Sequence, residues 1–348
     1  MSDINSLKSK IRVLLVDDSQ LFREVAAKLI SHDDRIEVIA TAGDPYEARD
    51  KIIEYKPDVM VLDIEMPKMN GIKFLEKLIP QFPLPVVICS STPLNAFAAL
   101  EAGAVDYVCK PHITSSDELN AFANELIVRI KSANSATTVR SGNVVYNVMH
   151  MNNARLSKSE TIIAIGGSTG ATEAVPRILC GFDSNTPPVV VVVHMPENFT
   201  AIYAQRLRQQ FPELDITEAR HGEYIHKGSV SIAAGKRHLR VFKDENGYFI
   251  TSLAGKKVSG HCPSVDVMFE SVAACGKKNA VGVLLTGMGS DGANGLKAIM
   301  DNGGYTIAQD EESCVVYGMP RVALESGAVS KQIKLDKIAE EILRKVKA

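Results

Sequence analysis

The sequence predicts an α/β protein made of two doubly wound domains, each built on a parallel sheet. Short, nearly continuous apolar runs alternate with amphipathic stretches up to about residue 131, and the same alternation resumes at Thr161. Such runs are typical of parallel strands whose two faces are covered by helices. The length of 348 residues also suits two domains of roughly 150 residues each.

The first region contains four apolar runs that we predict to be strands, and a polar residue follows each of them. Between the first two runs, residues 21–30 carry Phe22, Val25 and Leu29 at helical spacing, which predicts an amphipathic helix. The predicted strands are Ile11–Val16, Asp58–Leu62, Pro85–Cys89 and Val105–Cys109.

The second region repeats this pattern with a glycine-rich turn after its first strand and a helix from Leu296. Its predicted strands are Thr161–Ile165, Val189–Val193, Ser229–Ala233, Tyr248–Leu253 and Val281–Leu285. Residues 132–158 between the two regions are mostly small and polar, so they predict a linker. The predicted domains are therefore 1–131 and 159–348.

The composition disfavours several classes of function and indicates where the protein works. The net charge of -2 gives no support to nucleic-acid or anionic-membrane binding as the main task. The six cysteines form no C-x-x-C pair, which disfavours a zinc ribbon or a thioredoxin-type site and favours a reducing compartment. Without a signal peptide or an apolar run long enough to span a bilayer, we expect a cytoplasmic protein without membrane insertion.

Acidic residues follow two predicted strands of the first region. Asp17 and Asp18 end the first strand and Asp63 ends a later one, while Ser90 and Lys110 follow two others. Ligands of open α/β sheets bind beyond the carboxyl ends of the strands, and three carboxylates there would repel one another without a hard cation such as Mg²⁺. Metal, ammonium and hydroxyl together suit a phosphoryl group, although a single aspartate after a strand is more often a turn residue or a helix cap.

The joint pattern VDDS, LDIEMPKMNG, CSS and YVCKP resembles the flavodoxin-like receiver domain of two-component signalling. The resemblance implies that Asp63 accepts the phosphoryl group from a histidine kinase. It also implies that a metal ion is bound by Asp17, Asp18, Asp63 and the backbone carbonyl of Glu65. The residues implied in the response to phosphorylation are Ser90, Tyr107 and Lys110. Lys110 is followed by Pro111, in what is usually a cis bond in this family. Tyr107 has an equal alternative as an ordinary core or rim tyrosine.

A hydroxyl nucleophile is indicated in the second region, where residues 166–170 (GGSTG) fit G-x-S-x-G between a strand and a helix. A simple glycine-rich turn or a phosphate-binding loop is the alternative. His194 and Asp291 lie after two further strands, so Ser168, His194 and Asp291 can meet at one sheet edge as a nucleophile, a base and an orienting acid. The chain order Ser, His, Asp disfavours an α/β-hydrolase.

The segments GGSTGATEAV, VVVVVHMP, HCPSVDVMF and LLTGMGSDGANG resemble the Rossmann-like catalytic domain of chemotaxis protein-glutamate methylesterases. The resemblance implies the triad above, with an oxyanion hole at the Met288 N–H helped by Thr169. This chain departs from the family at three positions: Gly167 replaces alanine, Ala171 replaces glycine, and Cys262 replaces arginine, which puts substrate contacts at Cys262 in doubt.

The resemblance implies demethylation of glutamate methyl esters on chemoreceptors, with deamidation of glutamines by the same chemistry and no cofactor in the second domain. The two alternative functions are those of a receiver fused to a DNA-binding module and of a nucleotide-binding oxidoreductase. The near-neutral charge and strand-rich second half argue against the first. The turn at residues 166–170 does not match G-x-G-x-x-G, which argues against the second. His221, His226, His238 and His261 have no metal-ligand spacing, so we expect exposed or capping histidines, and Asp266 is expected at a helix start.

Overall fold

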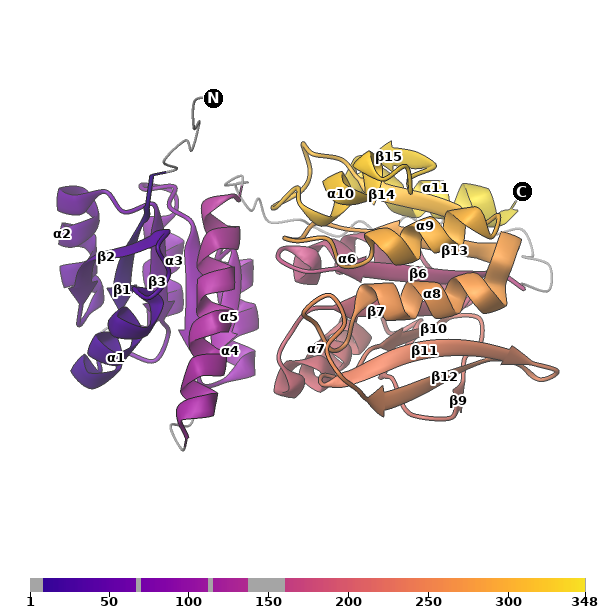
Figure 1. The fold of residues 1–348 in the computed structure, drawn as a ribbon, viewed down its shortest axis with the longest axis horizontal. Coiled ribbons are helices and arrows are strands. Elements are labelled where there is room, and N and C mark those ends of the chain that lie inside the picture. The colour runs from indigo at the N-terminus through magenta and orange to yellow at the C-terminus, as the bar shows by residue number, and fades with distance from the viewer. Residues whose placement is uncertain (1–8, 67–69, 112–114, 137–159, 348) are drawn as a thin grey trace, which may run out of the picture. The chain divides into compact units, whose positions relative to one another are not determined.

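The computed structural model describes residues 9–66, 70–111, 115–136 and 160–347. The chain divides into two compact units, Met1–Gly142 and Asn143–Ala348, which are described separately (Figure 1).

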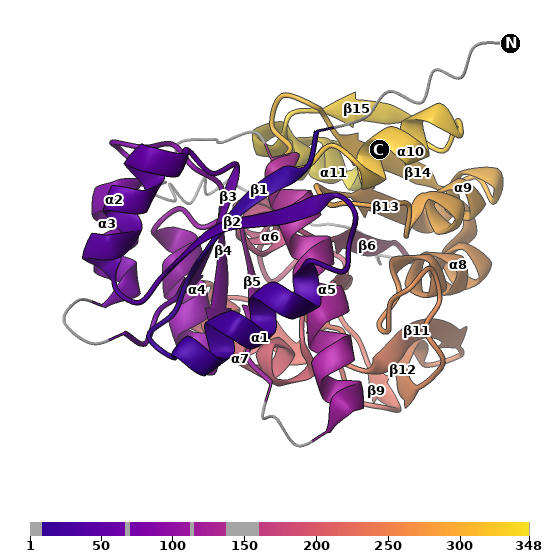
Figure 2. The same ribbon diagram turned by 60° about the vertical axis from the view of Figure 1, so that its left-hand side comes forward.

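The first unit is a five-stranded parallel sheet in the order β2-β1-β3-β4-β5, which is the flavodoxin-like order. Figures 1 and 2 both show α1 beside α5, and these two helices contact each other over one face of the sheet. The helices α2, α3 and α4 contact one another in sequence, which assigns them to the other face. The elements are β1 Ile11–Val16, α1 Gln20–Ile30, β2 Ile36–Ala42, α2 Pro45–Tyr55, β3 Val59–Asp63, α3 Gly71–Leu78, β4 Val86–Ser90, α4 Pro93–Glu101, β5 Asp106–Cys109 and α5 Ser116–Asn134.

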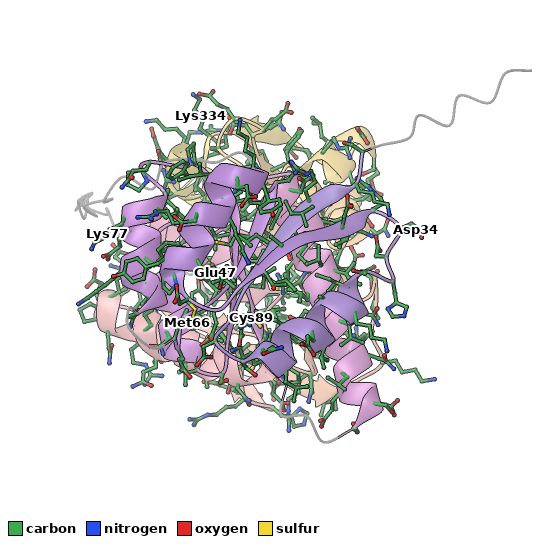
Figure 3. All side chains as sticks on the ribbon, turned by 90° about the vertical axis from the view of Figure 1, so that its left-hand side faces the viewer. Asp34, Glu47, Met66, Lys77, Cys89 and Lys334 are labelled. Carbon is green, nitrogen blue, oxygen red and sulfur yellow. The ribbon has the colours of Figure 1, made fainter. Side chains whose placement is uncertain are left out.

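The core of this unit joins the central strands to α1 and α5. Val13 and Val59 from the sheet pack with Ile30 of α1 and with Leu126 of α5, and all four are fully buried. Cys89, labelled in Figure 3, belongs to β4 and lies in the same core. Burial of β3 and β4 along their whole length explains why both read as continuous apolar runs rather than as alternating ones.

The second unit is a seven-stranded parallel sheet in the order β15-β14-β13-β6-β7-β10-β8, with a separate antiparallel sheet β11-β12-β9. The elements are β6 Ile162–Gly167, α6 Ala171–Leu179, β7 Val189–Val193, α7 Glu197–Gln210, β8 Asp215–Glu218, β9 Glu223–Tyr224, β10 Ser229–Ile232, β11 Arg237–Asp244, β12 Gly247–Ala254, α8 Val265–Gly276, a 3₁₀ turn Lys277–Asn279, β13 Ala280–Leu284, α9 Ala293–Asp301, β14 Tyr305–Gln309, α10 Met319–Glu325, β15 Lys331–Ile333 and α11 Leu335–Lys347.

Strands that are distant in sequence lie side by side at the centre of this sheet. Figure 1 shows β13 next to β6, and their pairing runs from Ala280 opposite Ile162 to Leu284 opposite Gly166. On the other side of β6, Gly167 lies opposite Val193 of β7. The ends of β6, β7 and β13 therefore reach the same edge of the sheet, where the loops that follow them can share a site.

The two parallel sheets confirm the predicted fold class, whereas the antiparallel sheet was not predicted. The run predicted at residues 248–253 is a strand, β12, but it pairs with β11 and β9 in a three-stranded sheet whose inner side chains pack towards α8. Periodicity alone did not show this, because strand direction depends on which partner the chain meets. The helix predicted from Leu296 begins three residues earlier, at Ala293.

The longest helix of the described ranges is α5, which has 19 residues and ends at Asn134. Its first turn carries Asp117 and Glu118, and its buried side includes the charged residue Arg129. None of the described helices combines the length and the apolar content that crossing a bilayer requires.

Candidate active site and phosphorylation site

The loop that carries the predicted nucleophile, called the nucleophile loop, is the tight turn at residues 168–170 between β6 and α6. Ser168 follows the last residue of β6. Its N–H donates to the Thr286 carbonyl at 3.0 Å, and its backbone carbonyl accepts the Ala171 N–H at 2.8 Å. Gly170 has φ +82°, a left-handed conformation that favours glycine. The turn therefore places Ser168 at the carboxyl edge of the sheet, directly before the first turn of a helix.

His194 and Asp291 meet at this same edge. His194 follows β7 and donates its backbone N–H to the Gly167 carbonyl at 3.2 Å, which ties it to the end of the neighbouring strand. Its ring Nε2 lies 2.8 Å from Oδ2 of Asp291, which is in the loop between β13 and α9. All three predicted residues are buried, with Ser168 the most exposed at 8%. Neighbouring strand ends thus bring the three residues to one sheet edge, as predicted.

The Asp291 carboxylate is held by the beginning of α8. Oδ1 accepts the Ser264 hydroxyl at 2.8 Å and the Asp266 N–H at 3.0 Å, while Oδ2 accepts the Val265 N–H at 2.8 Å as well as His194. Burial disfavours the charge, but the His194 interaction and these N–H groups prevail and lower the pKa of Asp291 to about 2. The carboxylate is therefore ionised at neutral pH and fixed in orientation.

Two histidines that the sequence did not associate with the site are close to it. The ring of His261 stacks on that of His194, with centroids 3.6 Å apart and planes 5° apart. His238 is buried and accepts the Ser264 N–H through Nδ1 at 3.3 Å. Our expectation of exposed or capping histidines is wrong for these two. The available signal was the position of His261 beside Pro-Ser-Val-Asp. Asp266, in contrast, lies in the first turn of α8 as expected.

Of the two residues implied as oxyanion donors, Thr169 lies in the nucleophile loop and Met288 in the loop between β13 and α9. Thr169 is almost fully buried, and its carbonyl accepts the Thr286 hydroxyl at 3.0 Å. Met288 is 37% exposed and follows Gly287, where a Cβ would lie 2.7 Å from the Cβ of Ser168. The glycine therefore allows the Met288 loop to approach the serine closely.

The acidic cluster of the first unit is built around Lys110. Its Nζ lies 2.6 Å from Asp17 Oδ2 and 2.7 Å from Asp63 Oδ2. Asp18 is exposed, and one oxygen from each of Asp17, Asp18 and Asp63 lies within 4.8 Å of the others. Burial raises the pKa of Asp17 despite the nearby Lys110. Three carboxylates against one ammonium leave an excess of negative charge, which fits a hard divalent cation with oxygen ligands.

The remaining predicted residues of the first unit surround this cluster. Glu65 donates its N–H to Asp63 Oδ1 at 3.1 Å, while its carboxylate accepts the Thr92 hydroxyl at 2.7 Å. Ser90 is fully buried at the end of β4. Tyr107 is also buried, 5.9 Å from the ring of Phe97 between centroids, so it occupies the core in this structure.

Comparisons with known proteins show the family to which the chain belongs. A family model described as CheB methylesterase matches residues 163–342, and one described as response regulator receiver domain matches residues 13–123. The chain belongs to the CheB methylesterase family. A protein-glutamate methylesterase/protein-glutamine glutaminase of Syntrophomonas wolfei is 47% identical over 335 residues, covering 96% of this chain and 97% of the relative. A relative of the same description from Salmonella typhi is 41% identical over 355 residues, covering 98% of each chain.

A solved structure supports the same assignment for the second unit. The catalytic domain of Thermotoga maritima CheB methylesterase matches with a TM-score of 0.51 and 36% identity, covering 53% of this chain and 97% of that one. The parallel sheets of the two units and these relatives confirm the predicted α/β class and family.

Two of the departures, at Gly167 and Ala171, are in direct contact in this methylesterase. A Cβ at Gly167 would lie 2.6 Å from the Cβ of Ala171, which is too close for two real side chains. The family usually has alanine at the first position and glycine at the second, so this chain has exchanged which of the two carries the methyl group. The exchange keeps one methyl group in the space that these two positions share.

The third departure, Cys262, lies directly after the stacked His261. Its carbonyl accepts the Lys236 N–H at 3.2 Å, and burial raises the pKa of its thiol. The bond between Cys262 and Pro263 is cis, whereas the expected cis bond before Pro111 is not among the cis bonds of the described chain. All six cysteines are free.

Proposed function

We propose that the second unit is a protein-glutamate methylesterase in which Ser168, His194 and Asp291 act as nucleophile, base and orienting acid. The observation that carries the proposal is the buried link from His194 Nε2 to the Asp291 carboxylate, which His194 and the N–H groups of α8 keep ionised, beside a serine in a strand-to-helix turn. A serine becomes nucleophilic when a neighbouring imidazole takes its proton, and the imidazole needs a carboxylate to fix its tautomer.

The contacts assign the two nitrogens of His194 to different tasks. Nε2 faces Asp291, so Nδ1 is the nitrogen that accepts the Ser168 proton as Oγ attacks the ester carbonyl. The Met288 N–H, with Thr169, stabilises the oxyanion that forms. His194 then gives the proton to the methoxy oxygen as the ester C–O bond breaks, so that methanol leaves. Water hydrolyses the acyl-serine to release the free glutamate side chain. A glutamine substrate follows the same steps with ammonia as the leaving group.

For the first unit we propose phosphorylation on Asp63. Asp17, Asp18 and Asp63, together with the Glu65 carbonyl, would hold Mg²⁺, and the bound ion offsets the negative charge of the incoming phosphoryl group. Lys110 already pairs with Asp63 and would pair with the phosphoryl oxygens.

The change that follows phosphorylation involves two further residues. Ser90, at the end of β4, would donate to a phosphoryl oxygen, and Tyr107 would act as the aromatic switch. This regulation is the reason that one chain carries both units. The phosphodonor would be a chemotaxis histidine kinase.

The partners and boundaries follow from the same proposal. The substrates are methylated chemoreceptors, and the enzyme acts in the cytoplasm without nucleic acid and without inserting into the membrane. We place the receiver at 1–131, the linker at 132–158 and the catalytic domain at 159–348, although α5 continues to Asn134. The catalytic domain needs no cofactor for the steps above.

Labelling tests the catalytic assignment directly. A serine-reactive phosphonate should modify the protein at one site, and peptide mapping should find the label on Ser168. The His194→Ala variant should label far more slowly, because the serine would then lack its base. Labelling of a different serine, or no labelling in a preparation that still releases methanol from receptor esters, would overturn the assignment of Ser168.

A further inference from the structure

We infer that Thr286, which lies outside the triad, is a positioning residue that orients both oxyanion donors of the esterase site. This inference rests on the proposed function and deepens it. Thr286 is 1% exposed and lies two residues after β13, between the nucleophile loop and the loop of Met288. Four of its polar contacts, two from the hydroxyl and two from the backbone, reach segments that shape the site.

On one side Thr286 holds the nucleophile loop at two consecutive points. Its carbonyl accepts the Ser168 N–H at 3.0 Å, which fixes the peptide before the serine. Its hydroxyl donates to the Thr169 carbonyl at 3.0 Å, which fixes the peptide after Thr169. The peptide between these two carries the Thr169 N–H. Its direction is therefore set by Thr286 from both ends.

On the other side the same hydroxyl holds the segment that orients Met288. It accepts the Val316 N–H at 2.9 Å, and the Val316 carbonyl accepts the Gly287 N–H at 3.0 Å. The Gly287 carbonyl accepts two further N–H groups, from Gly318 at 3.1 Å and Met319 at 2.8 Å. That carbonyl and the Met288 N–H belong to one planar trans peptide and point in opposite directions. Anchoring the carbonyl therefore aims the N–H.

The network is closed by Gln309, a fully buried residue at the end of β14. Its Oε1 accepts the Thr286 N–H at 2.9 Å, and its Nε2 donates to the Ser313 carbonyl at 2.7 Å. With both residues buried, water cannot easily replace a lost partner. Substitution of Thr286 by valine keeps the side-chain shape but leaves the Thr169 carbonyl and the Val316 N–H without the hydroxyl.

The test compares Thr286→Val with a matched loss of a buried hydroxyl elsewhere in the same sheet. Thr306 of β14 is fully buried. Its hydroxyl lies 3.0 Å from the Ser330 hydroxyl and accepts the Ser330 N–H at 2.8 Å. Thr306→Val is therefore the control for stability. Both variants should lower Tm to a similar extent, but only Thr286→Val should lower kcat for methanol release from methylated receptor, by about 10- to 100-fold.

Three further readouts separate positioning from general damage. KM should change little and the acid limb of the pH profile should not move, because the contacts of His194 and Asp291 are untouched. Thr286→Ser, which keeps the hydroxyl, should restore most of kcat. Gln309→Met, which removes the partner of the Thr286 N–H, should lower kcat in the same direction and serves if Thr286→Val does not fold.

Failure of the positioning role of Thr286 can be distinguished from failure of the proposed esterase function. If the wild-type protein releases no methanol from methylated receptor, the proposed function is wrong. If the wild type is active and Thr286→Val has the kcat of Thr306→Val, the positioning role is wrong. A pH profile displaced by Thr286→Val, or no recovery in Thr286→Ser, would also overturn it.

Discussion

The two units place their chemistry at the carboxyl edge of a parallel sheet, but they hold their buried carboxylates by different means. In the first unit Asp17 and Asp63 share one ammonium group, that of Lys110, and each accepts one backbone N–H, from Ser19 and Glu65 respectively. In the second, Asp291 is surrounded by neutral N–H and O–H groups at the start of α8 and by His194. Burial raises the pKa of Asp17 despite Lys110. For Asp291 burial is outweighed by His194 and the N–H groups, which lower its pKa to about 2.

The difference suits the two tasks. A site balanced by a side-chain ammonium should respond when a cation or a phosphoryl group arrives, because either would compete in the pairing of Lys110 with Asp17 and Asp63. A site held by backbone dipoles has no such freedom, and its geometry is ready before substrate binds. We therefore expect the first site to depend on ions and the second on the fixed positions of a few atoms.

The largest expected effect is loss of the nucleophile. Ser168→Ala should lower kcat for methanol release by about 10⁶-fold, since triad members act as a unit. His194→Ala should be nearly as severe and Asp291→Ala somewhat milder, with methanol measured by gas chromatography. Circular dichroism should show each variant folded. Substantial turnover by Ser168→Ala would mean that the second site is not a serine-nucleophile site.

Dependence on ions should separate the two sites. Asp63→Asn should take up no phosphate from a small phosphodonor, and a chelator should abolish uptake by the wild type, because the carboxylate cluster cannot host a further dianion without a cation. The chelator should leave basal ester hydrolysis unchanged while removing its stimulation by the phosphodonor. Phosphate uptake that survives the chelator would contradict the view of the first site as ion-dependent.

Most residues of both sites could be predicted because they end strands. Asp63, Ser90, His194 and Ser168 each follow an apolar run, and parallel sheets bring such positions to one edge. What could not be predicted depends on contacts between distant segments. The stacking of His261 on His194 comes from the loop before α8, which no periodic pattern places.

Contacts between distant segments also explain why the antiparallel sheet and the role of Thr286 could not be predicted from the sequence. The antiparallel sheet β11-β12-β9 follows from pairing that alternation does not encode. Thr286 reads as an ordinary residue after a strand, and its importance is visible only when Ser168, Thr169 and Val316 surround it.

The packing of Gly167 against Ala171 gives a smaller test of the fixed site. Gly167→Ala should place two methyl groups 2.6 Å apart and so cost about 1 to 3 kcal/mol in the free energy of unfolding, with a fall in kcat. The double variant Gly167→Ala/Ala171→Gly should recover most of both losses. Urea unfolding and methanol release on the four proteins of this cycle measure the coupling. Additive effects of the two substitutions would show that the exchange is not compensatory.

The smallest expected effect is on stability, and it concerns Mg²⁺. The carboxylates of the first site carry an excess of negative charge over Lys110, so a bound cation should stabilise the folded first unit. At a free Mg²⁺ concentration ten times the dissociation constant, the gain is about 1.4 kcal/mol in the free energy of unfolding. Hydrogen exchange followed by peptide mapping should show slower exchange in β1 and β3 and no change in β6 or β13.

Acid should act with opposite sign on the buried aspartates of the two units. The pKa of Asp291 is lowered in the folded chain, so its contribution to stability is present above its ordinary pKa of 3.8 and is lost as pH falls towards about 2. Asp17, whose pKa is raised, loses an unfavourable charge over the acidic range instead, and the benefit of Mg²⁺ should fade as the carboxylates take up protons. Asp18→Asn, which removes an exposed carboxylate of the cluster, should weaken the Mg²⁺ effect without altering the exchange of β6. An equal response of both units to Mg²⁺ would mean that the cation acts through general screening rather than at the cluster of Asp17, Asp18 and Asp63.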